Sequence, residues 1–158
     1  MNKYIPFLII LLLFTGCSKN QGEPYSLSDK DRENINSYLE LNFFNPRLKN
    51  GKIISVFDVL GSNKNQNEIY VWILIEEVYI EGGQVKRTTG LSQPLVIKVE
   101  EENGEIIVKG NKSPRDGEKF NSDINNLFPV KIREIISTYN KEHLEKQLED
   151  KIKMRYQF

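Results

Sequence analysis

The segment that most constrains the fold is an apolar run in the middle of the chain. Residues 69–75 read Ile-Tyr-Val-Trp-Ile-Leu-Ile, and β-branched and aromatic types dominate the run. Neighbouring side chains of a strand point to opposite faces, so this segment presents apolar groups on both faces. We therefore predict a central strand covered on both sides, in a fold that supplies one packing layer above the sheet and another below it.

Other β-rich segments are predicted to join this strand, over residues 52–60, 84–99 and 105–109. In the segment that begins at residue 84, Gly90 and Pro94 predict a bulge or a break, because proline cannot donate to a strand ladder. Asn103-Gly104 favours a type I′ hairpin turn, which returns the chain into the last strand. The segments together predict a four-stranded antiparallel meander.

Helices are predicted on both sides of this β region. Ser28, followed by acidic residues in the first turn, predicts a helix over residues 29–41. A short helix is expected over 122–127, and apolar residues then recur every three or four positions over about 130–155. The predicted fold class is α+β: a four-stranded antiparallel meander with an N-terminal helix and a long C-terminal helix packed on it.

The N-terminal residues follow a different pattern. A single basic residue, Lys3, precedes an unbroken apolar run over residues 7–14, and small residues follow the run. This organisation is typical of a secretory signal peptide. A helix that spans a bilayer takes ~20 apolar residues, so a transmembrane anchor is the weaker interpretation.

The only cysteine of the chain stands at the end of that segment. Leu13-Phe14-Thr15-Gly16-Cys17 resembles a bacterial lipobox, with Phe14 where leucine is usual. The resemblance implies cleavage between Gly16 and Cys17, which removes residues 1–16 as a signal peptide, and a diacylglycerol on the Cys17 thiol. The alternative is an ordinary signal peptide with an incidental cysteine. Two or three acyl chains on this residue would give stable membrane anchoring.

The rest of the chain is predicted to consist of a tether and one domain. Residues 17–24 hold the lipidated cysteine and a polar tether, and residues 25–158 form a single α+β extracytoplasmic domain. The chain has 22 basic and 22 acidic residues, and a net charge of zero gives no support for nucleic-acid binding. We therefore expect a protein anchored by lipid at the extracytoplasmic face of the cell membrane.

The sequence contains no familiar catalytic or metal-binding motif. One His and one Cys exclude His-pair and Cys-rich zinc sites. His143 belongs to the stripe of the last helix, where a packing or surface role is usual. Glu76 and Glu77 point to opposite faces of a strand and cannot form a carboxylate pair, but one of them is expected to pair with Lys86 or Arg87. We predict no cofactor, no metal ion and no enzymatic activity.

Residues 114–129 form the most distinctive pattern, with a Pro-Arg-Asp-Gly turn, an Asp-Ile pair and a Phe-Pro end. With the strand around Trp72, this pattern resembles an uncharacterised extracytoplasmic module. That module occurs in lipoproteins of Gram-positive bacteria and in the C-terminal part of some membrane metallopeptidases of the beta-lactam-sensor class. The resemblance covers about residues 65–152 and implies no established activity. Arg115 and Asp116 are predicted to form an ion pair that fixes the turn or, alternatively, a polar contact site beside Trp72.

Three functions remain open from the sequence. The main expectation is a binding, sensing or accessory role at the cell envelope, with a membrane or envelope protein as partner. The first alternative is a small-ligand pocket of the cystatin-like or NTF2-like kind between the curved sheet and the first helix, by analogy of fold. The second is a hydrolase that uses carboxylates. A deep cavity with a converging acid would favour an alternative, whereas a filled core with an exposed apolar stripe on the last helix would favour partner binding.

Overall fold

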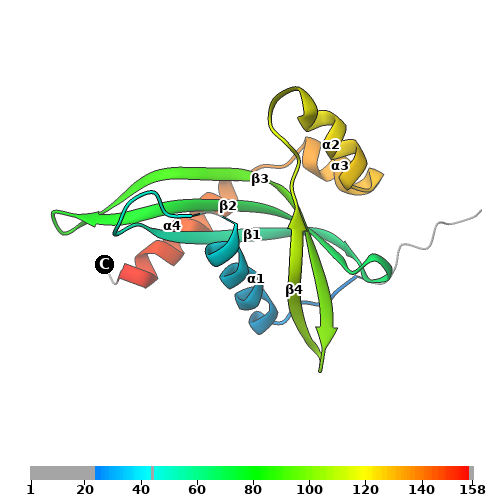
Figure 1. Ribbon diagram of the computed structural model, residues 1–158, viewed down its shortest axis with the longest axis horizontal. Helices are drawn as coiled ribbons and strands as arrows, with labels where there is room; N and C mark the ends of the chain where they lie inside the picture. The colour runs from blue at the N-terminus through cyan, green and yellow to red at the C-terminus, as the bar shows by residue number, and fades with distance from the viewer. Residues whose placement is uncertain (1–23, 44, 157–158) are drawn as a thin grey trace, which may run out of the picture.

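The computed structural model describes residues 24–43 and 45–156, so Gly16, Cys17 and the predicted signal segment lie outside the described residues. The elements follow the order α1 (Asp29–Asn42), β1 (Lys52–Asn63), η1 (Lys64–Gln66), β2 (Glu68–Glu81), β3 (Gln84–Glu102), β4 (Glu105–Lys112), η2 (Gly117–Lys119), α2 (Phe120–Leu127), α3 (Val130–Ser137) and α4 (Glu142–Tyr156). Figure 1 shows the resulting arrangement. The predicted α+β meander, with a helix at each end of the sequence, is confirmed.

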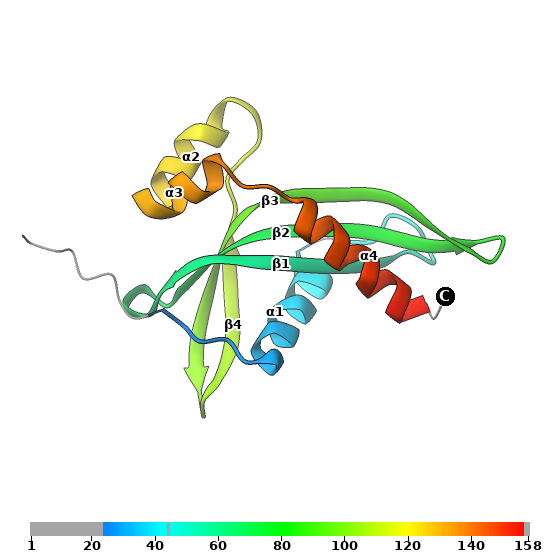
Figure 2. The ribbon, with the colours of Figure 1, turned by 180° about the vertical axis from the view of Figure 1, so that it is seen from behind.

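The strands form one antiparallel sheet in the order β1-β2-β3-β4. Figures 1 and 2 show α1 on one face of this sheet and α4 on the other. Val71, Ile73 and Ile75 of β2 are fully buried beneath α1, and Leu74 and Val78 are buried beneath α4. The prediction of a central strand covered on both sides is therefore confirmed.

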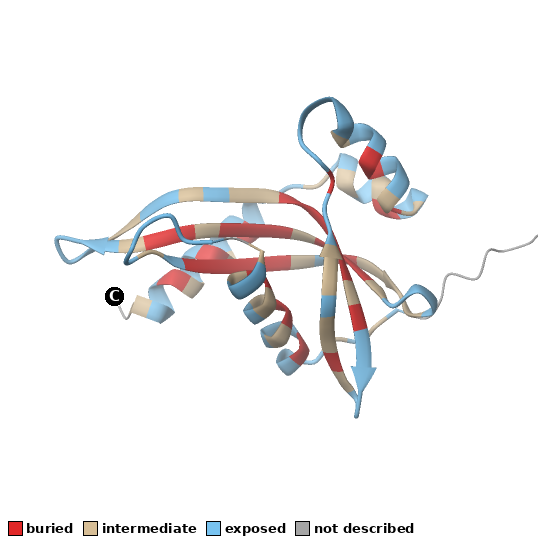
Figure 3. Ribbon diagram, in the orientation of Figure 1, coloured by how far each residue is buried: buried red, intermediate tan, exposed pale blue. Residues whose placement is uncertain are grey.

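The two faces are packed by separate apolar clusters. Under α1, Ile35 and Leu39 have no exposed surface and fill the space between the helix and the sheet. On the other face, α4 packs on β1 and β2, and α2 and α3 pack on a separate stretch formed by Leu60, Tyr70 and Val96 of β1, β2 and β3. Figure 3 shows that the buried residues concentrate along the middle of the strands and on the inner sides of the helices. Each fully buried Leu or Ile contributes ~1.5–3 kcal/mol to folding.

The third strand runs without a break through both residues that predicted an interruption. A register shift of β2 against β3 does lie beside Gly90, so a bulge is present there. Pro94 instead lies in regular register opposite Trp72. The fourth strand pairs with β3 only from Val96 onward, so β3 has a free side at Pro94. A proline is tolerated on such an edge because no ladder bond is lost.

The single helix predicted over 130–155 is wrong, because the chain leaves the helix between α3 and α4. Thr138 has φ −119° and ψ 9°, and the Asn140 side chain accepts the Glu142 N–H at 2.9 Å. Asn and Thr offer the backbone such side-chain alternatives and are poor helix formers. The interruption also allows the Tyr139 ring to stack on Trp72, with 4.4 Å between ring centroids. The apolar spacing continues through the break, which is why it predicted one helix.

Candidate functional site

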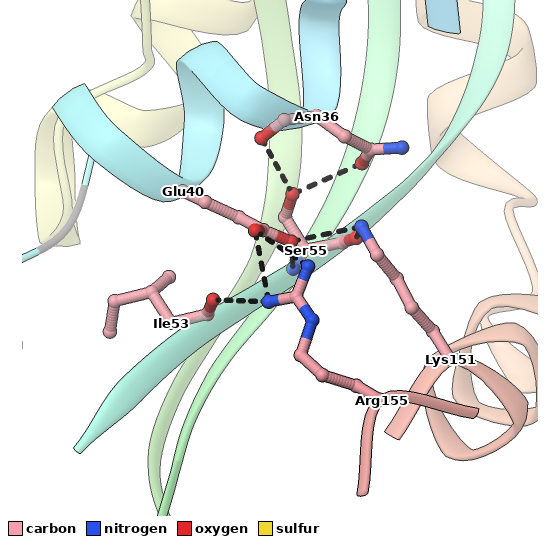
Figure 4. Close-up of polar contacts among 6 residues, drawn as sticks. All are labelled: Asn36, Glu40, Ile53, Ser55, Lys151 and Arg155. Carbon is pink, nitrogen blue, oxygen red and sulfur yellow. Dashed lines mark hydrogen bonds and ion pairs between the residues drawn. The ribbon is translucent and has the colours of Figure 1, made fainter. Parts of the chain in front are cut away.

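The outer edge of β1 is closed by side chains from helices on both faces of the sheet. The Ser55 N–H donates to Oε1 of Glu40 in α1 (3.1 Å), and the Ser55 carbonyl accepts from Nζ of Lys151 in α4 (2.8 Å). Arg155 donates to the carbonyl of Ile53 at 3.4 Å. Figure 4 shows these side chains converging on the strand edge. Because unpaired groups of an edge strand invite pairing with another chain, these contacts protect the edge.

Glu40 is the centre of this edge cluster, which we define as Asn36, Glu40, Ser55, Lys151 and Arg155. Its carboxylate accepts from Lys151 at 2.9 Å and from both terminal nitrogens of Arg155 at 3.1 Å. The Ser55 hydroxyl completes the cluster by bonding to Asn36. A groove of about 290 Å³ lies above it, lined by three acidic and three basic residues among its polar groups. Because the central groups already satisfy one another, the groove offers a ligand few free partners.

A second polar cluster surrounds Asp58 on the α4 face of β1. Tyr139 donates its hydroxyl to Asp58 at 2.6 Å, Gln147 donates at 3.3 Å, and Nδ1 of His143 lies 3.3 Å from the carboxylate. Burial, followed by the hydrogen bond to Asp58, raises the pKa of Tyr139. The His143 side chain is 67% exposed. A carboxylate, an imidazole and a phenol could exchange protons. However, Asp58, His143 and Tyr139 line neither the groove beside Glu40 nor the cavity between the sheet and α2.

The third site is a cavity of about 290 Å³ between the sheet and the C-terminal end of α2, which we call the α2 pocket. Its lining consists of Gln66, Glu68, Tyr70, Val96, Lys112, Asn126, Leu127, Phe128 and Pro129. The strand register explains the sheet side of this lining. Tyr70 pairs with Val96, and Val96 pairs with Lys112, so these three side chains form one row across the same face. The neighbouring row contains Glu68, Lys98 and Gly110.

The charges in the α2 pocket are unevenly compensated. Glu68 accepts from the Tyr70 hydroxyl at 2.7 Å and forms an ion pair with Lys98 at 2.5 Å. Burial, followed by the contact with Glu68, raises the pKa of Tyr70, so its hydroxyl remains a donor. The Lys112 side chain is exposed and forms no hydrogen bond or ion pair with another residue of the described ranges. The pocket therefore combines a neutralised carboxylate with a free ammonium group.

The structure assigns separate surroundings to the three residues of the predicted contact site. Trp72 stacks on Tyr139 and donates its indole N–H to Ser92 at 2.9 Å. Arg115 bonds to both oxygens of Asp123 in α2 at 2.7 Å, and its backbone N–H also donates to Asp123. Asp116 is exposed and has no partner in the part of the chain that the structure describes. The predicted Arg115–Asp116 ion pair is therefore wrong.

The position of the first helical turn of α2 explains this change of partner. Asp123 lies in that turn and is buried, and its carboxylate accepts hydrogen bonds from Arg115 in the preceding loop, whereas Asp116 is an exposed residue of the loop itself. The hydrogen bonds from the Arg115 side chain and backbone hold the pKa of Asp123 far below its usual range. The interactions of the described residues include none that joins Trp72 to Arg115 or Asp116. The expected ion pair of the β2 glutamates does form, between Glu76 and Arg87.

Sequence reasoning did not identify the edge cluster or the α2 pocket. Their members are ordinary polar residues far apart in the chain; Glu40 and Lys151, for example, are 111 positions apart. For the α2 pocket a partial signal exists, because the Asn103-Gly104 turn sets β3 against β4. Even so, the register of β3 against β4 shifts by one residue beside Val99. Lys112 therefore pairs with a different residue of β3 from the one that the turn alone would predict.

The described ranges contain neither a metal-binding cluster nor a membrane-spanning helix. No group of three or more His, Cys, Asp or Glu side chains could hold a metal ion there, and no described helix is long and apolar enough to cross a membrane. Comparison of the chain with family models, curated proteins and solved structures finds no match.

Removing the Glu40 carboxylate should open the β1 edge. In Glu40→Ala, Ser55 loses its acceptor and Lys151 and Arg155 lose their anion, so the free energy of unfolding should fall by ~1–3 kcal/mol. Self-association should rise as well, because the edge becomes available to another chain. Urea unfolding and light scattering measure the two effects. The matched control is Glu33→Ala on the exposed side of α1, and equal losses in both variants would contradict the role of the edge cluster.

The Arg115–Asp123 pair should make stability depend on pH. Folding lowers the pKa of Asp123. The stabilisation of the folded protein by this carboxylate is therefore complete above the unfolded-state pKa of ~3.9, and it declines as the pH falls toward the folded-state pKa. Asp123→Asn should therefore be less stable than wild type near neutral pH, and this difference should shrink by about pH 2. Urea unfolding midpoints at both pH values measure it. Asp116→Asn should show almost no difference at either pH, and a larger effect there than at Asp123 would reverse the assignment.

Proposed function

We propose that this chain is a lipid-anchored extracytoplasmic domain with a binding or accessory role at the cell envelope. The proposal is carried by the position of Cys17, the sole cysteine, directly after an apolar run and a small residue. The attachment of Tyr25 to the sheet supports it. The Tyr25 N–H donates to Ser62 at 2.7 Å, its hydroxyl donates to Asn67 at 3.3 Å, and the Lys64 ammonium lies over its ring. These contacts support a domain boundary just before residue 25.

The short distance in sequence between Cys17 and Tyr25 would orient the domain. A chain of this length spans at most about 30 Å when fully extended. Tyr25 is held at the β1–β2 turn, so this end of the sheet would face the membrane. The β2–β3 turn lies at the opposite end of the molecule (Figures 1 and 2). The 14 residues of β2 separate the two turns by about 45 Å.

The packing bears on where a partner or ligand could bind. The apolar stripe of α4, made of Leu144, Leu148 and Ile152, is buried on the sheet, so α4 lacks the exposed stripe that would favour partner binding. Two of the exposed apolar side chains lie at the end remote from Tyr25: Ile80 near the end of β2 is 57% exposed, and Met154 in the last turn of α4 is 74% exposed. We infer that a protein partner would bind at this distal end.

The small-ligand alternative also gains a specific location. Ile35 and Leu39 fill the contact between α1 and the sheet, where the sequence analogy placed a pocket. The α2 pocket lies on the other face and holds a carboxylate, a buried tyrosine and a free lysine. A binding function through this pocket is compatible with the anchor and is the second candidate.

Anchoring is tested at Cys17. Cys17→Ala should abolish acyl labelling and move the protein out of the membrane fraction, or leave the signal segment uncleaved, because the thioether cannot form. Fractionation and intact-mass measurement on cells expressing each variant report both outcomes. Ser18→Ala should behave like wild type. Unchanged processing and labelling in Cys17→Ala would remove the basis of the proposal.

Partner binding is tested by photo-crosslinking from the native membrane. A photoreactive residue at position 80 or 154 should capture a specific protein if the distal end is the contact surface. The matched control is position 130, where Val130 is equally exposed (58%) but lies at the start of α3. Failure to capture any specific protein from positions 80 and 154 would count against the accessory role, and capture only from position 130 would relocate the surface.

A further inference from the structure

The α2 pocket carries an excess of positive charge at one side. Lys112 is the last residue of β4 and shares a face with Val96 and Tyr70, which places its ammonium group in the lining. Glu68, the acidic residue in the lining, is already bound to Lys98 and to the Tyr70 hydroxyl. Three charged groups thus leave one cation without a counter-ion, and the ligand that complements it is an anion.

The sheet leaves open space next to that cation. Gly110 lies in the row of Glu68 and Lys98, two residues before Lys112, so any side chain there would point toward the same face. A Cβ built on Gly110 would meet no atom within 4 Å. The space on this side of Lys112 is therefore open.

The opposite side of the pocket presents hydrogen-bond acceptors. Asn126 and Leu127 form the last turn of α2, where the terminal carbonyls of a helix carry partial negative charge. The Asn126 side chain has no hydrogen bond to another described residue, so its amide group is free to bond a ligand. Glu68 and Gln66 add further acceptor oxygens. Acceptors of this kind are satisfied by hydroxyl groups, whereas a second anion would be repelled.

We propose that the α2 pocket binds an anionic polyol, meaning a small molecule or headgroup that carries a phosphate or carboxylate beside hydroxyl groups. The anion would contact Lys112, the hydroxyls would donate to Glu68 and the end of α2, and the carbon skeleton would lie against Leu127 and Phe128. A volume of about 290 Å³ is near the lower limit for small-molecule sites (~300–1,000 Å³), which fits a ligand of glycerol phosphate size. This inference deepens the small-ligand form of the proposed function.

Two sources could supply such a ligand. It could be a free solute, or it could be the headgroup of a glycerophospholipid. The lipid source is geometrically accessible if Cys17 is acylated, because Gln66 of the pocket lies within the β1–β2 connection that holds Tyr25, at the end that would face the membrane. Both sources share the same chemistry and are separated by the experiment.

The test uses the full chain in non-ionic detergent micelles, titrated with sn-glycerol 3-phosphate, glycerate and uncharged glycerol while amide chemical shifts are recorded. We expect saturable shifts around the α2 pocket with either anion and none with glycerol. Lys112→Gln should weaken binding by about tenfold or more, because a charge-assisted bond is lost. Lys109→Gln on the same strand is the control, since that lysine pairs with Glu100 and Glu102 in the β3–β4 hairpin and should leave affinity unchanged.

A second arm distinguishes the source. The same chain in nanodiscs of phosphatidylglycerol should show the pocket shifts without added solute if the headgroup binds, and nanodiscs of phosphatidylcholine should not. Shifts only with the soluble anions assign the site to a free solute. Absence of saturable shifts with both anions and with phosphatidylglycerol, or equal affinity in Lys112→Gln and wild type, overturns the proposal. The Cys17 variants report on anchoring independently, so failure of either proposal is recognised separately.

Discussion

The structure depends on the burial of β2 on both of its faces. A strand with apolar side chains on alternate sides is stable only between two packing layers, and the chain supplies one from its N-terminal helix and the other from its C-terminal third. The sheet separates these two helical layers, so their side chains can contact one another only beyond an edge strand. They meet at β1, where Glu40 from one layer bonds to Lys151 and Arg155 from the other. The edge cluster is thus a direct consequence of two-sided burial in an open sheet.

The same open sheet creates the α2 pocket at its other margin. β4 is short and pairs with only the second half of β3, so the sheet has four strands at one end and three at the other. α2 begins soon after β4 ends, and it packs over the place where the sheet changes from three strands to four, which we call the step. Tyr70 and Phe128 fill the inner part of that step, and the polar ends of Glu68 and Lys112 line its mouth. The pocket therefore arises from strand length and register, with polar residues placed at its rim.

Local sequence patterns predicted which helices and strands form. They were less informative about where those elements end and which distant residues contact one another. The Asn103-Gly104 turn, the Ser28 cap and the double-faced apolar run each act over a few residues, and the structure contains the hairpin, α1 and the inner strand that they indicate. The break at Thr138 was not predictable from spacing, because Tyr139 leaves the helix for a stacking partner 67 positions earlier in the sequence, Trp72. Likewise, Arg115 pairs with Asp123 and not with Asp116 because the first turn of α2 lies against the loop that contains Arg115. Contacts between distant segments decide both sites, and no short motif encodes them.

The edge cluster has a consequence for the order in which this protein can fold. Ser55 and Lys151 are 96 positions apart, so the N-terminal helix and the sheet can assemble before the chain that closes β1 has been synthesised. During that interval the strand edge between Ile53 and Ser55 lacks its cationic partners. Contacts of such long sequence separation form slowly because a large loop must close first. The last turns of α4 therefore determine how long a nascent chain stays open to pairing with its neighbours.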